Sequence, residues 1–330
     1  MMRARTRGRH GDRRAAAVVA GVVFAQAAVA ADFPDRPITL MVGFSAGGSN
    51  DITARVISGP LSELLGVPVI VENRVGAAGV ISTQHVARST PDGYTLAVTS
   101  ASPLVITPHT LSRLPYDARK DFAAVSLLAI TPQTLAVNPG VRASDLAGFI
   151  ELARTRDVTL ASAGVGGLPH LAIELLKLAA PGTRIVHVPY KGAAPAVTDA
   201  LAGHVDGVVM DLPAVSQQIA SGGMRGIAIA SDARSAFLPD LATAAEQDVR
   251  GFVAVNWIGV IAPARAPQPV IHKLHDALAK VMHQAQVEQT LARDAVQVSV
   301  SETPLAFQTF IDAEDEKWAT IVRTAGVKAE

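Results

Sequence analysis

The chain has 330 residues, of which 49% are hydrophobic and 18% are charged, and its 29 basic residues equal its 29 acidic residues in number. This length is sufficient for two domains, and the apolar content excludes an intrinsically disordered chain. The sequence contains no cysteine, which excludes disulfide bonds, thiolate nucleophiles and cysteine-ligated metals.

The first 30 residues have the pattern of a secretory signal peptide. Six arginines from Arg3 to Arg14 precede an apolar run at 15–23 that is too short to span a bilayer, and Ala28-Val-Ala30 fits a cleavage site. We therefore expect cleavage after Ala30 and a periplasmic mature protein, with a transit segment or an uncleaved anchor as alternatives. Cleavage would leave a mildly acidic chain, which argues against nucleic acid or an anionic membrane as a partner.

After a short polar entry, strand-like and helix-like runs alternate. Their spacing predicts strands at 38–42, 67–72 and 94–99 and helices at 51–65 and 80–88. A second block repeats the alternation, with predicted helices at 144–153, 170–179, 195–202 and 214–221 and strands at 158–161, 184–188, 205–210 and 226–230. Ser144 is the predicted N-cap of the first helix in this block. Such alternation is typical of mostly parallel sheets with helices on both faces.

Two extended apolar runs, at 125–137 and 252–261, connect the blocks. Two long helices are predicted to end the chain, at 269–292 and 304–324, the second with Thr303 as its N-cap and Gly326 as its stop. The predicted fold is therefore α/β, with two lobes that are each a mostly parallel sheet flanked by helices, joined by two hinge crossings. We assign residues 31–130 and 257–330 to lobe 1 and residues 131–256 to lobe 2.

Glycine-rich turns lead from a strand into a helix at two places. Gly47 and Gly48 precede the helix that Asp51 opens, and residues 163–169 precede the helix that begins at His170. The first N–H groups of a helix lack intrahelical partners and lie at the positive end of its dipole. Each turn therefore predicts a small anion-binding site that needs no basic side chain. A plain tight turn is the alternative for the second.

Polar residues also follow two strand ends, where open parallel sheets place their ligands. Ser100 and Ser102 come after strand 94–99, and Asp211 ends strand 205–210. Asp211 could face a cleft or cap the helix that follows. His170 could donate to a carboxylate or cap its own turn.

An exported serine hydrolase is the alternative interpretation. Gly43-Phe-Ser45-Ala-Gly47 fits the G-x-S-x-G nucleophile elbow between a strand and a helix. However, it follows the first strand of the mature chain, so no earlier strand supplies an oxyanion loop, and no HGGG-like segment precedes it. Spacing also selects no general base among the candidates His170, His187, His204 and His272.

No cofactor or metal is predicted. The turn at 163–169 lacks the third glycine of a dinucleotide-binding motif, and no acidic residue follows at the distance that a ribose requires. His272 and His275 share a helix face, but no carboxylate lies in register to complete a metal site.

Short motifs occur in a fixed order along the mature chain: Arg36-Pro-Ile, Phe44-x-Ala-Gly-Gly-x-x-Asp51, Val71-Glu-Asn-Arg-x-Gly-Ala-x-Gly79, Pro91-Asp-Gly-Tyr-Thr-Leu96, Leu114-Pro-Tyr-Asp117, Asp121-Phe-x-x-Val-Ser-Leu127, Ala161-Ser-Ala-Gly164, His170-Leu-Ala, His187-Val-Pro-Tyr-Lys-Gly-Ala-Ala-Pro195, Trp257-x-Gly and Ala262-Pro-Ala. In this combination the sequence closely resembles the extracytoplasmic substrate-binding proteins of tripartite tricarboxylate transporters, the Bug-type receptors.

The resemblance implies a periplasmic receptor with a two-lobed, type II-like periplasmic-binding-protein fold, and not an enzyme. It implies that the ligand is a small carboxylate, such as a di- or tricarboxylate, an acidic amino acid or an aromatic acid. We also expect a monomer without a cofactor, with a membrane permease of the tricarboxylate type or a sensor kinase as its protein partner.

Matched residue by residue, the family's two cleft loops fall on Phe44, Ala46, Gly47, Gly48 and Asp51 in lobe 1 and on Ser162, Ala163, Gly164 and His170 in lobe 2. Together with Ser45, Ser100, Ser102 and Asp211, these are the candidate ligand-binding residues. The sequence departs from the family pattern at Val80-Ile-Ser82 and Met210-Asp-Leu212, two places that could tune ligand choice.

Overall fold

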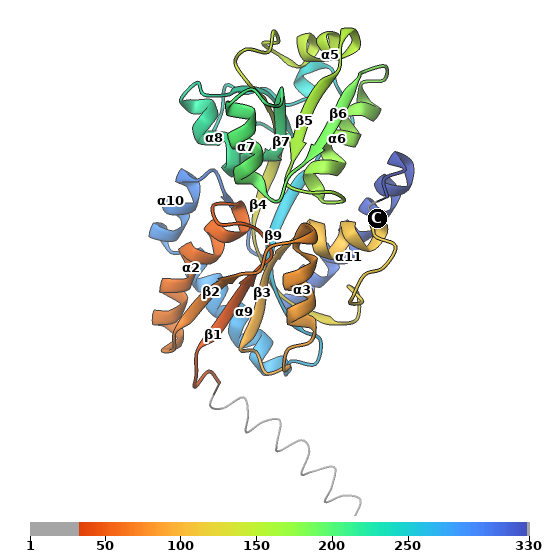
Figure 1. The fold of residues 1–330 in the computed structure, drawn as a ribbon. Coiled ribbons are helices and arrows are strands. Elements are labelled where there is room, and N and C mark those ends of the chain that lie inside the picture. Colours follow the sequence, from red (N-terminus) through yellow and green to blue (C-terminus); the bar gives the residue numbers. More distant parts are fainter. Residues whose placement is uncertain (1–32, 329–330) are drawn as a thin grey trace, which may run out of the picture.

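The computed structural model describes residues 33–328, so the predicted signal peptide and its cleavage site lie outside the described residues. Eight of the ten strands in the described residues form one continuous path of pairing, in the order β2-β1-β3-β9-β4-β7-β5-β6 (Figure 1). The other two, β8 and β10, each pair with β4. The chain has the predicted α/β fold with two lobes. Within residues 33–328, no helix has the length and apolar character needed to cross a membrane.

Lobe 1 is built on a parallel three-stranded core. β1 pairs in parallel with both neighbours, and β9 closes this side of the lobe by pairing antiparallel with β3. The strands are β1 (Ile38–Val42), β2 (Val69–Asn73), β3 (Thr95–Ser100) and β9 (Val255–Pro263), with the short β10 (Gln297–Val298) paired to β4. The helices are α2 (Ser49–Leu65), α3 (Val80–Ala87), α4 (Thr107–Thr110), α9 (Gln268–Met282) and α10 (Ala285–Arg293).

Lobe 2 repeats the arrangement on a smaller scale. β5 pairs in parallel with β6 and β7, whereas β7 and β8 pair antiparallel with β4. The strands are β5 (Val158–Ser162), β6 (Ile185–Pro189), β7 (Gly207–Asp211) and β8 (Arg225–Ala230). The helices are α5 (Leu146–Thr155), α6 (Leu168–Ala179), α7 (Ala193–Leu201) and α8 (Leu212–Ala220).

A single strand, β4 (Phe122–Val137), runs through both lobes. Its residues up to Pro132 pair with β9, and from Gln133 onward it pairs with β7 and β8. Proline has no N–H to donate to a sheet, so it is tolerated at a position where the pairing is interrupted. Pro132 lies where β4 exchanges one partner for the next, and this is the point at which the two sheets meet.

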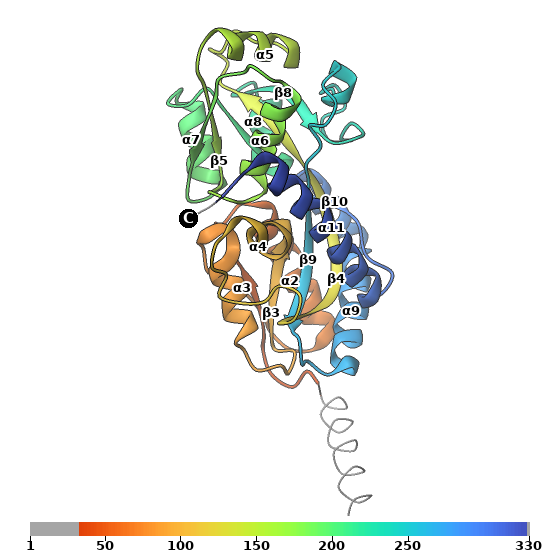
Figure 2. The same ribbon diagram turned by 90° about the vertical axis from the view of Figure 1, so that its right-hand side faces the viewer.

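The C-terminal helix α11 (Pro304–Ala325) lies alongside the junction and contacts β4, the segment after β3 and α6 of lobe 2 (Figure 2). As predicted, Thr303 caps its start, with its hydroxyl accepting from Ala306 N–H at 3.0 Å, and Gly326 ends it in a left-handed conformation.

Two local predictions were wrong, and one feature was missed. The helix expected at 269–292 is two helices, because Gln284 adopts an extended conformation that turns α10 so that it buries Val287 and Leu291. The N-cap of α5 is Asp145 and not Ser144, since the Asp145 carboxylate accepts from Gly148 N–H at 2.8 Å. Two short helical segments after β3, Ser102–Ile106 and α4, were not predicted.

The packing of α11 on the sheet depends on a glycine. The ring of Trp257 on β9 meets Phe307 of α11 edge to face, with ring centroids 5.6 Å apart, and both side chains are buried. A Cβ on Gly259 would lie 2.2 Å from Phe307 Cζ and 3.0 Å from the carbonyl oxygen of Ser126. Only glycine therefore lets the helix approach the strand this closely.

We expect Gly259→Ala to lower the free energy of unfolding by about 1–3 kcal/mol, the usual cost of overpacking a core. The matched control is Gly59→Ala within α2, where a Cβ meets no atom within 4 Å. There the helix propensity of alanine should stabilise the protein by about 0.5–1 kcal/mol. Thermal unfolding of both variants measures this, and equal melting temperatures would contradict the proposed packing role.

Candidate functional site

A cavity of about 640 Å³ lies between the lobes. Loops of lobe 1 line one wall and loops of lobe 2 the other, with the contributing segments at 43–45, 75–79, 163–165 and 189–192, together with Leu111. We call this space the outer cavity. Its volume falls in the range of about 300–1,000 Å³ that is typical of small-molecule sites.

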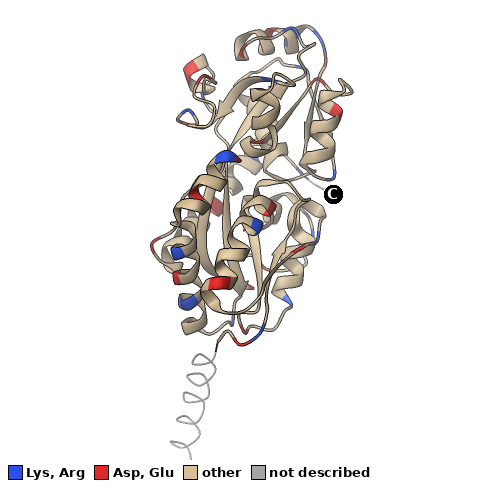
Figure 3. Ribbon diagram, turned by 90° about the vertical axis from the view of Figure 1, so that its left-hand side faces the viewer, with Lys and Arg blue, Asp and Glu red and all other residues tan. Residues whose placement is uncertain are grey.

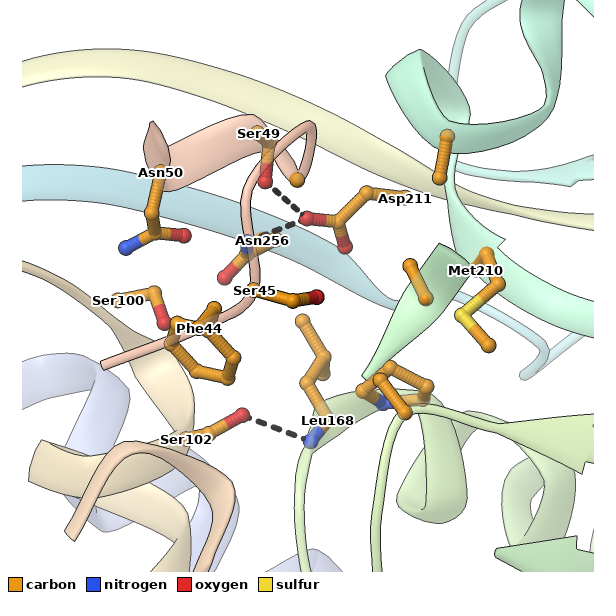
Figure 4. Close-up of a pocket in the computed structure, with 15 residues that line it drawn as sticks. Phe44, Ser45, Ser49, Asn50, Ser100, Ser102, Leu168, Met210, Asp211 and Asn256 are labelled. Carbon is orange, nitrogen blue, oxygen red and sulfur yellow. Dashed lines mark hydrogen bonds between the residues drawn. The ribbon is translucent and has the colours of Figure 1, made fainter. Parts of the chain in front are cut away.

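A second space of about 50 Å³ lies next to the outer cavity and shares Phe44, Ser45 and Ala163 with its wall. We call it the inner pocket (Figure 4). Its polar lining comes from both lobes and from the crossing strand β9: Ser45, Ser49, Asn50, Ser100, Ser102, Asp211 and Asn256. The inner pocket has room for one end of a ligand, and the outer cavity for the remainder.

The first glycine-rich turn is held in shape by Asp51. This buried carboxylate accepts hydrogen bonds from Gly47 N–H at 3.0 Å, from Arg55 Nε at 2.9 Å and from Asn73 Nδ2 at 2.8 Å. Although burial opposes ionisation, these hydrogen bonds hold the pKa of Asp51 below its usual value. Asp51 lines neither space, so in the structure it supports the turn rather than the cavity.

The start of α2 keeps backbone donors beside the inner pocket. Gly47 has a φ of +80°, which only glycine adopts without strain, and this turn places Ser49 and Asn50 on the pocket wall. No acceptor within the described chain bonds the N–H groups of Ser49 and Asn50. The helix start therefore retains the donors that the sequence predicted for an anion.

The second glycine-rich turn is different, because the start of α6 is already occupied. Leu168 N–H donates to Ser102 Oγ of lobe 1 at 3.0 Å, and the next residue, Pro169, has no N–H (Figure 4). The N-terminal anion site predicted here is therefore largely filled by the protein's own hydroxyl. Ser102 serves as a contact between the lobes.

Two histidines that line neither space support the second glycine-rich turn. Gly166 N–H donates to His170 Nδ1 at 3.0 Å, and the rings of His170 and His187 stack with centroids 3.9 Å apart. His187 Nε2 lies 2.6 Å from Ser162 Oγ, which is also 2.9 Å from the carbonyl oxygen of Gly164. Ser162 and His170 thus support a loop whose other members, Ala163 and Gly164, face the cleft.

Asp211 faces the inner pocket. It stands at the N-cap position of α8, but its side chain makes no cap bond. Instead the carboxylate accepts from Ser49 Oγ of lobe 1 and from Asn256 Nδ2 on β9, the latter at 2.8 Å (Figure 4). It also accepts from Gln133 Nε2 on β4. Burial raises the pKa of Asp211 even though these donors oppose the shift. One carboxylate thus connects both lobes and both crossing strands.

The candidate residues fall into three sets. Those that line the inner pocket are Phe44, Ser45, Gly48, Ser100, Ser102, Ala163 and Asp211. Gly164 lines the outer cavity. Those that line neither space are Ala46, Gly47, Asp51, Ser162 and His170. Ser49, Asn50 and Asn256 also line the inner pocket and were not predicted; the first two could have been found from their place directly after Gly48.

A model of the tripartite tricarboxylate transporter family receptor matches residues 53–327. The chain belongs to this family. It is 36% identical to Protein BugT of Bordetella pertussis over 318 residues, which covers 94% of this chain and 97% of BugT. Members of this family are periplasmic solute-binding receptors and not enzymes.

Two solved structures share the fold of this receptor over nearly its whole length. A structure of an R. palustris protein with adipate has a TM-score of 0.86 at 30% identity and covers 90% of this chain and 99% of its own. MatC from Rhodopseudomonas palustris with bound malate has a TM-score of 0.83 at 29% identity and covers 88% of this chain and 100% of its own.

The serine hydrolase alternative is rejected, since the family consists of receptors. The geometry agrees, because no histidine in the described part of the chain forms a hydrogen bond with Ser45. The serine–histidine pair that does form, Ser162 with His187, lies behind the cleft loop.

We expect the stability contributed by His187 to depend on pH. Burial, with the charges of His170 and Lys177, lowers the pKa of His187 to about 3 from an ordinary value near 6.5. Between these values only the unfolded chain takes up the proton, so stability present above about pH 6.5 is lost as the pH falls. The melting-temperature difference between the wild type and His187→Gln should therefore shrink from about pH 7 to about pH 4.5.

The same replacement at His204, whose side chain is 69% exposed, is the control and should give a difference that varies much less with pH. If the melting-temperature difference between the wild type and His187→Gln stays constant or grows as the pH falls, the lowered pKa of His187 in the folded protein is contradicted.

Proposed function

We propose that this receptor captures a small carboxylate between its lobes and delivers it to an uptake system of the tripartite tricarboxylate type. The observation that carries the proposal is the outer cavity, whose two walls are backbone-rich loops from different lobes. A ligand held there is bound by both lobes at once, which favours the closed arrangement when ligand is present.

The polar groups at the cleft suit an anion. Among the described residues that line the outer cavity, Lys191 is the one with a charged side chain, and the N–H groups at the start of α2 lie beside the adjoining inner pocket. Hydrogen bonds to a charged group contribute about 1.5–3 kcal/mol each. The relatives solved with adipate and malate support a carboxylate as the ligand class.

Direct contacts between the lobes support closure as the binding motion. Ser49 bonds Asp211, Ser102 bonds Leu168 N–H, and a Cβ on Gly192 would lie 2.5 Å from Ser45 Oγ across the cleft. We propose that the lobes rotate about the two crossings near residues 129–133 and 254–258, which are segments of β4 and β9.

The signal pattern at residues 1–30 supports export before function, and the family supports a periplasmic site of action. Lys and Arg residues are interspersed with Asp and Glu in the view of Figure 3, rather than gathered in one basic surface. This distribution supports a small-molecule ligand rather than nucleic acid. We propose that the receptor acts as a monomer, with a membrane permease or a sensor kinase as its protein partner.

The test of this function is a thermal-shift series on residues 31–330, purified free of bound ligand. The series contains di- and tricarboxylates, acidic amino acids and aromatic acids, each with its neutral amide as control. An acid at a hundred times its dissociation constant should add about 2.7 kcal/mol of stability, which is a shift of several degrees, and its amide should add little. A series in which no acid stabilises the protein would overturn the proposal.

Closure should be sensitive to Gly192. We expect Gly192→Ala to weaken binding of any acid found in that series by tenfold or more, because the added methyl group would meet Ser45 Oγ before the lobes close. Adding Ser45→Gly should restore part of the affinity. Gly182→Ala is the control, since Gly182 also has a positive φ but a Cβ there meets no atom within 4 Å. Equal loss of affinity in both single variants would exclude the steric explanation.

A further inference from the structure

The inner pocket places a carboxylate next to the donors that suit an anion. At the start of α2, the N–H groups of Ser49 and Asn50 have no acceptor within the described chain, and they lie at the positive end of the helix dipole. Asp211 of lobe 2 lines the same space of about 50 Å³ (Figure 4). A ligand carboxylate that accepts from this helix start therefore lies close to a second carboxylate.

No cation lies between the two carboxylates to compensate their charge. Asp211 is the charged residue among those that line the inner pocket in the described chain, and no lysine, arginine or histidine joins it. The elements that surround Asp211, namely β4, β7, β9 and α8, contain no other charged side chain and no histidine. Two carboxylates that share a site without a cation do not both ionise at neutral pH, because each raises the pKa of the other.

The charged and titratable groups of the remaining elements at the pocket do not line it. Most of them pair within their own element, as Asp51 does with Arg55 and Glu174 with Lys177. Asp211 is therefore the group of the protein that is placed to share a proton with a ligand in this space. The groups in question are Asp51, Arg55 and Glu63 of α2, His170, Glu174 and Lys177 of α6, and Asp199 of α7.

The hydrogen bonds of Asp211 can accommodate a proton without the loss of a partner. Ser49 Oγ and Asn256 Nδ2 bond its Oδ2, and Gln133 Nε2 bonds its Oδ1. The hydroxyl of Thr131 also faces the carboxylate. An amide nitrogen can only donate, whereas a hydroxyl can donate or accept. When Oδ2 carries a proton it can donate to Ser49 Oγ, and the hydrogen of Ser49 is then free to turn toward the ligand.

We propose that Asp211 takes up one proton from solvent when the ligand binds, so that Asp211 and the ligand carboxylate share a single negative charge in the inner pocket. This inference rests on the proposed function, since it requires an anionic ligand. The proton removes the repulsion between the two carboxylates and turns the Ser49 hydroxyl into a third donor beside the N–H groups of Ser49 and Asn50. It returns to solvent when the lobes open and the ligand leaves.

The electrostatics of Asp211 in the free protein favour this step. Burial raises the pKa of Asp211, although the donors Ser49, Asn256 and Gln133 oppose the shift. A ligand carboxylate raises this pKa further, because a second negative charge disfavours the ionised form. The group therefore binds a proton more tightly in the complex than in the free receptor, and by linkage the ligand binds more tightly as the pH falls.

A pH-stat counts the protons directly and needs no buffer that could compete for the site. Receptor and ligand solutions are brought to the same pH and mixed, and the acid needed to hold that pH gives the number of protons taken up. The probes are succinate, malate, adipate, glutamate and benzoate. For each acid that binds, we expect an uptake that approaches about one proton between about pH 7 and pH 9, and a dissociation constant that rises by up to about tenfold per pH unit.

Asp211→Asn should abolish the uptake and make the dissociation constant nearly independent of pH in this range, because an amide does not titrate. Asp206→Asn is the matched control, since Asp206 precedes the same strand, β7, at its opposite end and bonds Arg156 there. It removes the same charge outside the pocket and should keep the uptake.

Ser49→Ala identifies the group that takes up the proton even if Asp211→Asn does not fold. The hydroxyl of Ser49 favours the ionised form of Asp211 in the free protein. Without it the pKa of Asp211 rises, so the uptake should move to higher pH.

The outcomes separate this inference from the proposed function. If the acids bind without proton uptake between about pH 7 and pH 9, the inference is overturned and the proposed function stands. Uptake that persists in Asp211→Asn, or that Ser49→Ala leaves at the same pH, would assign the proton to another group and also overturn the inference. If none of the acids binds, the proposed function fails as well.

Discussion

The fold depends on one constraint, which is that β4 must pair with β9 in one lobe and with β7 and β8 in the other. The exchange of partners at Pro132 and Gln133 fixes where the two sheets meet and brings both crossings to the floor of the cleft. Gln133 and Asn256, which lie on these two strands, both bond Asp211 of the inner pocket. The connection between the lobes and the candidate site are therefore built from the same segments of chain.

The two glycine-rich turns have taken different roles, although their sequences are alike. At the first, the Asp51 carboxylate holds the turn from within lobe 1, and the N–H groups of Ser49 and Asn50 remain available. At the second, a hydroxyl from the opposite lobe takes the leading N–H of α6. One turn is suited to a ligand and the other to contact between the lobes, so the cleft is asymmetric.

Local signals in the sequence predicted most of the architecture. The strand at 38–42 was placed correctly because its apolar run stops at a glycine turn, and α11 because Thr303 and Gly326 are strong start and stop signals. The break between α9 and α10 could not be read in this way, since His283 and Gln284 are not helix breakers and tertiary burial of Val287 and Leu291 decides it. The site was less predictable because it also depends on tertiary contacts. The hydrogen bond between Ser102 and Leu168, for example, joins residues 66 positions apart.

The order of strands has a consequence for how the protein acquires its structure. β9 lies between β3 and β4 in the sheet of lobe 1, although more than a hundred residues separate it from them in the chain. Until β9 has been made, the edges of β3 and β4 that it covers remain without their partner. Pairing of such distant segments is slow, and open strand edges can associate with other chains. Lobe 1 therefore completes its sheet only after the whole of lobe 2 has been synthesised, and a chaperone that binds the nascent chain would protect it during that interval.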